Sequence, residues 1–143
     1  TDEMTKISVK YIKEKKPVLG AFIFDNPDHV GHDAGHNTPA YYANLKELDG
    51  YIGQIIQATK DAGIYENCIF IVTSDHGGID HGHGGKTLEE INTPFIIAGK
   101  GVKKGGEFQE SMMQFDCAPT VLEIFGLEGP QVWVGRSMSQ VFE

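Results

Sequence analysis

The sequence contains little cysteine, a minority of basic residues and no long apolar run. It has 2 cysteines in 143 residues, and its 12 lysines and arginines stand against 20 aspartates and glutamates. Cys68 lies in an apolar run and Cys117 opens an expected helix, which favours two buried thiols over a disulfide or a cysteine metal site. The acidic balance argues against a nucleic-acid-binding surface, which needs a basic face. No apolar run is long enough to cross a membrane, and residues 1–4 lack the features of a signal peptide.

The residues that are present follow an α/β pattern. Hydrophobic residues make up 40% and charged residues 22%, which is ordinary globular usage, and the length suits a single domain over residues 1–143. Continuous apolar runs are typical of central strands in a parallel sheet. The order of these elements predicts an α/β fold whose mainly parallel sheet is flanked by helices. The expected elements are helices over residues 3–15, 40–62 and 116–125 and strands over residues 18–24, 68–73 and 93–98.

Two polar loops follow the first two expected strands, over residues 25–39 and 74–86. They contain the histidines together with a dense set of aspartates. Ligands of open α/β sheets gather at the carboxyl ends of strands, so the coincidence of both loops favours one site.

In the first loop, Asp28 and His32 are four residues apart. If the segment makes one turn, both side chains point to the same side and can share a metal ion. An aspartate oxygen and a histidine nitrogen suit zinc, manganese or iron. His29 and His36 are each more typical of surface histidines than of ligands.

In the second loop, Asp75 and His76 come directly after a strand. Both reach one ion only if the chain bends there, and Gly77 and Gly78 permit that bend. The glycines that flank His83 can return it towards the same site.

Three segments resemble the metal motifs of the alkaline phosphatase superfamily, in particular its type I phosphodiesterase/nucleotide pyrophosphatase and sulfatase-like branch. They read Asn-Pro-Asp-His-Val-Gly-His at residues 26–32, Thr-Ser-Asp-His-Gly at 73–77 and His-Gly-Gly at 83–85. The resemblance covers most of the chain from about residue 17 onward. It implies a truncated alkaline-phosphatase-like sandwich, with the chain as the C-terminal, metal-binding portion of the catalytic domain.

The resemblance also implies a site for two divalent metal ions, with zinc preferred and manganese as the alternative. Asp28, His32 and His83 would hold one ion, and Asp75 and His76 would hold part of the second. His81 competes with His83 for its role. His83 is preferred because the Gly-Gly-Lys-Thr segment follows it.

The activity implied by the resemblance is hydrolysis of small-molecule phosphate mono- or diesters. In this family a threonine or serine from an earlier strand attacks phosphorus, and no hydroxyl of this sequence stands in that context. We therefore expect a missing N-terminal part to carry the nucleophile, and we expect the chain alone to be inactive. The compartment stays open, although the resemblance favours an exported or periplasmic location.

Three alternatives remain at this point. The first is a sulfatase, although many sulfatase-like sites use calcium and oxygen-rich ligands, so His32 and His83 weigh against it. The second is a relative of cofactor-independent phosphoglycerate mutase, whose manganese loop residues 26–32 also resemble. The third is a metal-binding module without catalysis. A longer reading frame with an upstream threonine or serine would favour an enzyme.

Overall fold

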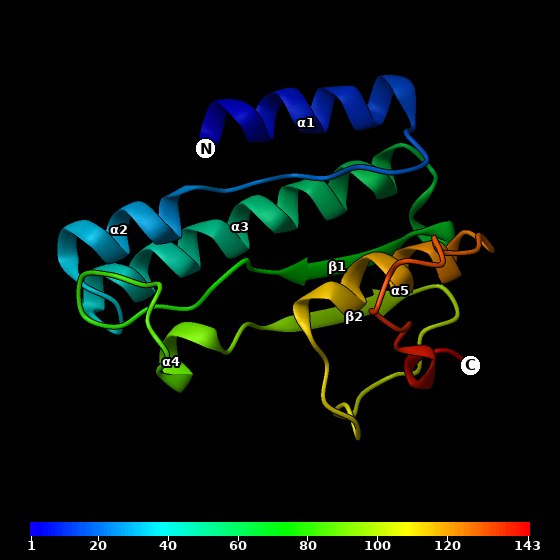
Figure 1. Cartoon of the computed structure of the whole chain (residues 1–143). Coiled ribbons are helices and arrows are strands. Elements are labelled where there is room, and N and C mark those ends of the chain that lie inside the picture. The colour runs from blue at the N-terminus through cyan, green and yellow to red at the C-terminus, as the bar shows by residue number, and fades with distance from the viewer. The chain divides into compact units, whose positions relative to one another are not determined.

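The computed structural model describes residues 1–143, which form two compact units (Figure 1). The first unit consists of Thr1–Cys68 and His76–Pro94, and the second consists of Ile69–Asp75 and Phe95–Glu143. The first contains the helices α1 (Asp2–Lys15), α2 (Asn26–Ala34), α3 (Pro39–Asp61) and α4 (Leu88–Ile91) and the 3-10 turn η1 (Tyr65–Asn67). The second contains β1 (Ile69–Thr73), β2 (Phe95–Gly99), α5 (Cys117–Ile124) and the 3-10 turns η2 (Gln114–Asp116) and η3 (Ser139–Val141).

The first unit is built on α1 and α3, which lie alongside each other in Figure 1. Their shared core consists of Ile12 from α1, Ile55 and Ala58 from α3, and Ala62 just after α3. Both helices confirm the predicted ones. The start of α3 has a clear cause, because the Thr38 hydroxyl accepts a hydrogen bond from a backbone amide of the first turn.

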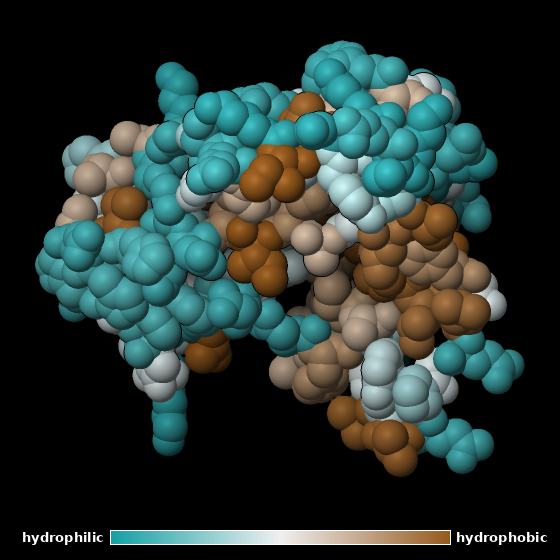
Figure 2. Space-filling view, turned by 90° about the horizontal axis from the view of Figure 1, so that it is seen from above, coloured by the Kyte–Doolittle hydropathy of each residue, from teal (hydrophilic) through white to brown (hydrophobic).

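The segment between α1 and α2 corrects the prediction of a buried strand over residues 18–24. It is extended, but no strand pairs with it. Phe22 and Phe24 pack against the core, whereas Val18 and Ile23 are 86% and 80% exposed. Successive side chains of an extended chain point to opposite sides, and in this run only Phe22 and Phe24 face the core. Figure 2 shows brown, apolar atoms among teal, hydrophilic ones on the face of the molecule that it draws.

Helix α2 replaces most of the loop that the sequence predicted over residues 25–39. Pro27 lies in its first turn, where the missing amide is tolerated, and Gly35 ends it with a φ of 90°. The sequence hid this helix because only Val30 and Ala34 of its nine residues are aliphatic, too few to form an apolar face. The spacing of Asp28 and His32 was the helical signal that the metal motif contained.

In the second unit, β1 and β2 confirm two predicted strands but pair antiparallel, from Ile69 opposite Gly99 to Thr73 opposite Phe95. They form the only sheet among residues 1–143, so the predicted mainly parallel sheet is not confirmed. Helix α5 confirms the helix predicted over residues 116–125. None of the helices combines the length and the apolar character that crossing a membrane requires.

Asp116 anchors the C-terminal segment of the second unit to the start of α5. Its side chain is 2% exposed, and its two carboxylate oxygens accept hydrogen bonds from the amides of Met113 (2.8 Å) and Arg136 (2.9 Å). The buried Thr120 hydroxyl donates to the Asp116 carbonyl and accepts from the Met138 amide. A segment without regular secondary structure is thereby held by side chains.

Candidate metal centre

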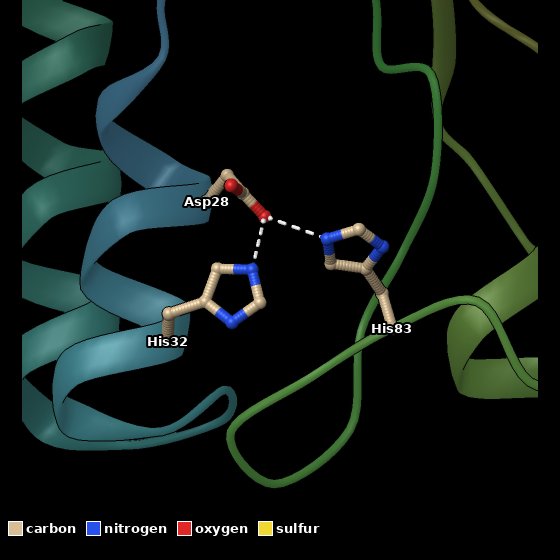
Figure 3. A group of neighbouring side chains, drawn as sticks. All are labelled: Asp28, His32 and His83. Carbon is tan, nitrogen blue, oxygen red and sulfur yellow. Dashed lines mark ion pairs between the residues drawn. The ribbon is translucent and has the colours of Figure 1, made fainter.

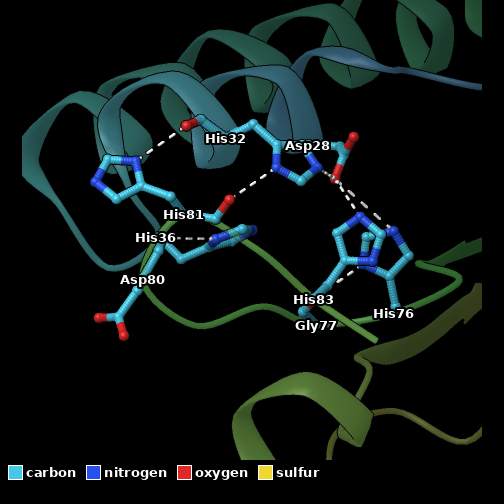
Figure 4. A network of polar contacts seen from close by, with 8 residues as sticks. All are labelled: Asp28, His32, His36, His76, Gly77, Asp80, His81 and His83. Carbon is cyan, nitrogen blue, oxygen red and sulfur yellow. Dashed lines mark hydrogen bonds and ion pairs between the residues drawn. The ribbon is translucent and has the colours of Figure 1, made fainter. Parts of the chain in front are cut away.

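Three imidazoles of the first unit lie around one carboxylate oxygen of Asp28, and Figure 4 shows all of them while Figure 3 shows two. Asp28 Oδ1 lies 3.3 Å from His83 Nε2, 3.4 Å from His32 Nε2 and 3.8 Å from His76 Nε2. The ligand atoms of Asp28, His32 and His83 all lie within 4.8 Å of one another. Ligands at about 2.0–2.2 Å from a tetrahedral zinc ion are about 3.3–3.6 Å apart. The two shortest separations therefore match those of a shared ion.

Helix geometry fixes half of this cluster. Asp28 and His32 are one turn apart on α2, so their side chains lie one above the other on the same face. His76 and His83 come from the chain between β1 and α4, where the structure is irregular. The cluster thus joins a rigid helix to a loop about 50 residues later in the sequence.

The central oxygen has no hydrogen-bond partner. Asp28 Oδ1 is a buried atom that accepts no hydrogen bond, although 39% of the side chain is exposed. Burying an acceptor without a partner costs about 1–3 kcal/mol, and more when the group is charged. An atom in this state, surrounded by ring nitrogens, fits a bound cation.

The histidine hydrogen bonds support the same conclusion. His32 Nδ1 donates to the His81 carbonyl at 2.8 Å, and His76 Nδ1 donates to the Gly77 carbonyl at 2.7 Å. A neutral imidazole that donates from Nδ1 presents a lone pair at Nε2, which is the arrangement of a metal ligand. A lone pair facing a carboxylate oxygen is repelled unless a proton or a metal ion lies between them. The rings of His76 and His83 also stack at 3.7 Å, where two protonated rings would repel each other.

The structure brings together four of the five predicted metal ligands: Asp28, His32, His76 and His83. The fifth, Asp75, is the last residue of the segment Ile69–Asp75 of the second unit, and its ligand role stays a prediction. His81 is not among the clustered ligand atoms, because its Nδ1 donates to the His32 carbonyl at 3.0 Å. His29 is exposed on α2.

Glu90 shapes the loop that carries His83, and its role was not predicted. Its carboxylate accepts hydrogen bonds from the Thr87 hydroxyl (2.7 Å), the Gly85 amide (2.8 Å) and the Thr87 amide (3.2 Å). These bonds, that of the Thr87 hydroxyl first, lower the pKa of Glu90. The sequence signal was available, because a threonine followed three residues later by glutamate is the pattern of a capping box at a helix start.

The fold is similar to that of solved structures of one class of protein. A protein from Bacteroides thetaiotaomicron described as a sulfatase superimposes with a TM-score of 0.70 at 17% identity, covering 96% of this chain and 44% of its own. A second from Bacteroides fragilis, also described as a sulfatase, gives a TM-score of 0.66 at 24% identity, covering 98% and 32%. The fold is therefore the alkaline-phosphatase-like α/β fold of sulfatases.

The family follows from the sequence comparison. Residues 1–115 match the family of type I phosphodiesterase / nucleotide pyrophosphatase. The chain belongs to this family, which confirms the predicted membership of the alkaline phosphatase superfamily.

Named relatives carry out several reactions. The chain is 33% identical over 119 residues to a 2,3-bisphosphoglycerate-independent phosphoglycerate mutase of Cereibacter sphaeroides, covering 80% of this chain and 22% of that protein. It is 31% identical over 123 residues to the human GPI ethanolamine phosphate transferase 2 catalytic subunit, covering 81% and 12%. Arylsulfatase K of Danio rerio is 33% identical over 92 residues, covering 61% and 18%. The chain spans less than a quarter of these proteins, which belong to a metal-dependent superfamily of phosphoryl and sulfuryl transfer.

Proposed function

We propose that this chain is the metal-binding portion of a hydrolase acting on phosphate mono- or diesters. The observation that carries the proposal is the buried Asp28 Oδ1, which accepts no hydrogen bond and lies within 3.8 Å of three imidazole nitrogens. In this proposal Asp28, His32 and His83 hold one divalent ion. Asp75 and His76 contribute to a second.

The donor set favours zinc, with manganese as the alternative. Calcium and magnesium prefer oxygen ligands, whereas imidazole nitrogens with one carboxylate suit zinc. Neutral histidines and one carboxylate leave a divalent ion with a net positive charge. Bound metal would supply charge neutralisation for an anionic ester. The residues of the chain would hold the ion, and their side chains are 39% (Asp28), 44% (His32) and 31% (His83) exposed, so solvent reaches the cluster.

The complete reaction belongs to a longer protein in this proposal. Both compact units are parts of one catalytic domain, and an N-terminal part supplies the attacking threonine or serine. The short share of each relative that the chain covers, 22% and 12% for the mutase and the transferase, supports this arrangement. The chain alone is then a metal-binding protein with little or no hydrolytic activity.

Metal content after exhaustive dialysis tests the site. We expect the wild-type chain to retain about one zinc ion after zinc loading, and we expect Asp28→Ala with His32→Ala to retain none. His29→Ala is the matched control, because it removes an exposed histidine from the same helix. If the wild type and the double variant retain the same amount of metal, the assignment of these ligands is wrong.

A sulfatase is the second candidate, and it is favoured by the structural likeness to proteins described as sulfatases and by the arylsulfatase K relative. The discriminating assay uses the longer protein with p-nitrophenyl phosphate, bis(p-nitrophenyl) phosphate and p-nitrophenyl sulfate. Faster turnover of either phosphate ester supports the proposed function. Faster turnover of the sulfate ester replaces it with the alternative.

A further inference from the structure

A second set of contacts, beside the metal-ligand cluster, connects helix α2 to the loop between β1 and α4 that carries His76 and His83. The loop makes a tight turn over residues 79–82, closed by two backbone hydrogen bonds between Ile79 and Gly82 of 3.0 and 2.9 Å. Asp80 adopts a φ of 47° within this turn. Its carbonyl accepts a hydrogen bond from the His36 amide at 2.6 Å, so the turn is attached to the chain just after α2.

The His36 ring occupies a slot between α2 and the loop. A Cβ atom added to Gly31 would lie 2.3 Å from His36 Nε2, and one added to Gly78 would lie 2.2 Å from the same atom. Gly31 is a buried position of α2, and Gly78 lies two residues after His76. The ring also donates from Nδ1 to the Asp80 carbonyl at 3.1 Å, as Figure 4 shows.

Two reciprocal hydrogen bonds run beside this slot. His32 Nδ1 donates to the His81 carbonyl, and His81 Nδ1 donates to the His32 carbonyl, at 2.8 and 3.0 Å. One member of this pair is a candidate ligand. The contact therefore links the orientation of the His32 ring directly to the position of the turn.

The geometry points to His36 as a positioning residue, which sets the separation between the ligands of α2 and those of the loop. This inference rests on the proposed metal site, and it assigns to His36 no contact with the ion. Metal–ligand distances lie within about 0.2 Å of their usual values, so a loop displaced by an added methyl group would weaken binding of the shared ion. Gly31 and Gly78 are required because any side chain there would occupy the space of the ring.

A double-mutant cycle at His36 and Gly78 tests the inference. The proteins are the wild type, His36→Ala, Gly78→Ala and the double variant, titrated with Zn²⁺ by calorimetry and with Co²⁺ by visible absorption. We expect each single variant to weaken metal binding about 10–100-fold, the usual effect of residues that support ligands. We expect the double variant to bind more tightly than Gly78→Ala alone, because removal of the ring makes room for the new methyl group. The Co²⁺ spectrum should shift in the single variants and return towards that of the wild type in the double variant.

Two further variants complete the test. Gly53→Ala in α3 is the control, since an added Cβ there has no neighbour within 4 Å, and it should leave metal binding unchanged. His36→Asn keeps a donor for the Asp80 carbonyl and should retain more affinity than His36→Ala. The inference is overturned if both single variants bind metal within about twofold of the wild type, or if the two substitutions are additive. A wild type that binds no metal would instead overturn the proposed site. In that case, thermal unfolding of the same four metal-free proteins tests the contact between the His36 ring and Gly78. We expect the effects of the two substitutions on the free energy of unfolding to be coupled, and additive effects would contradict the contact.

Discussion

Replacement of Asp116 by asparagine should destabilise the second unit although it hardly changes the shape of the side chain. Both carboxylate oxygens are used, by the amides of Met113 and Arg136, in a position that is 2% exposed. Asparagine offers one acceptor and turns an NH₂ group towards the other amide. A buried donor left without an acceptor costs about 1–3 kcal/mol, so we expect a loss of that size. Asp116→Ala leaves both amides unsatisfied, and we expect a loss of about 2–6 kcal/mol.

Urea denaturation followed by tryptophan fluorescence measures this effect locally. Trp133 is the single tryptophan, and it belongs to the same unit as Asp116. With a slope of about 1–3 kcal/mol per molar urea, the expected loss lowers the midpoint by roughly 1 M. Glu110→Gln is the control, because Glu110 forms an exposed ion pair with Arg136, and such pairs contribute at most about 1 kcal/mol. Equal midpoints for Asp116→Asn and Glu110→Gln would refute the reasoning.

Three further outcomes are expected. Ile12→Ala should lower the free energy of unfolding by about 2–5 kcal/mol in thermal denaturation, whereas Ile7→Ala, at a position 62% exposed, should have little effect. The lowered pKa of Glu90 stabilises the fold above the pKa that the group has in the unfolded chain, and this stability is lost as the pH falls through the pKa in the folded chain. Glu90→Gln should therefore destabilise the chain at neutral pH. Circular dichroism should show a smaller loss of stability with acid for this variant than for the wild type. Burial raises the pKa of both Cys68 and Cys117, so both should react with iodoacetamide at pH 8 more slowly than a free thiol does.

The sequence predicted the elements whose signals are local. Helix α3 has a threonine cap, a proline in its first turn and apolar residues at helical spacing, and it was predicted to within a residue or two. The strands β1 and β2 were found because each is a short apolar run. Their antiparallel pairing was not predicted, because an apolar run contains no information about the direction of its neighbour.

The same argument explains the strand wrongly expected over residues 18–24. Its apolar run resembles those of β1 and β2, but a strand also requires a partner for its backbone hydrogen bonds, and none pairs with it in the structure. The sequence analysis missed the roles of Glu90 and His36 for two different reasons. The capping pattern of Glu90 could have been read from the sequence, whereas the slot for His36 exists only once Gly31 and Gly78 lie on either side of it.

The candidate site also has a part that depends on local sequence and a part that depends on tertiary contacts. The spacing of Asp28 and His32 is imposed by α2 itself, while His83 arrives through a loop held by Glu90 on one side and by His36 on the other. The Nε2 lone pairs of His32 and His76 then face a carboxylate oxygen that accepts no hydrogen bond, so the metal-free cluster carries repulsion that a bound ion removes. An ion that binds only the folded cluster stabilises the fold, by about 4 kcal/mol when present at a thousand times its dissociation constant. Metal binding and the docking of the loop on α2 are therefore expected to reinforce each other.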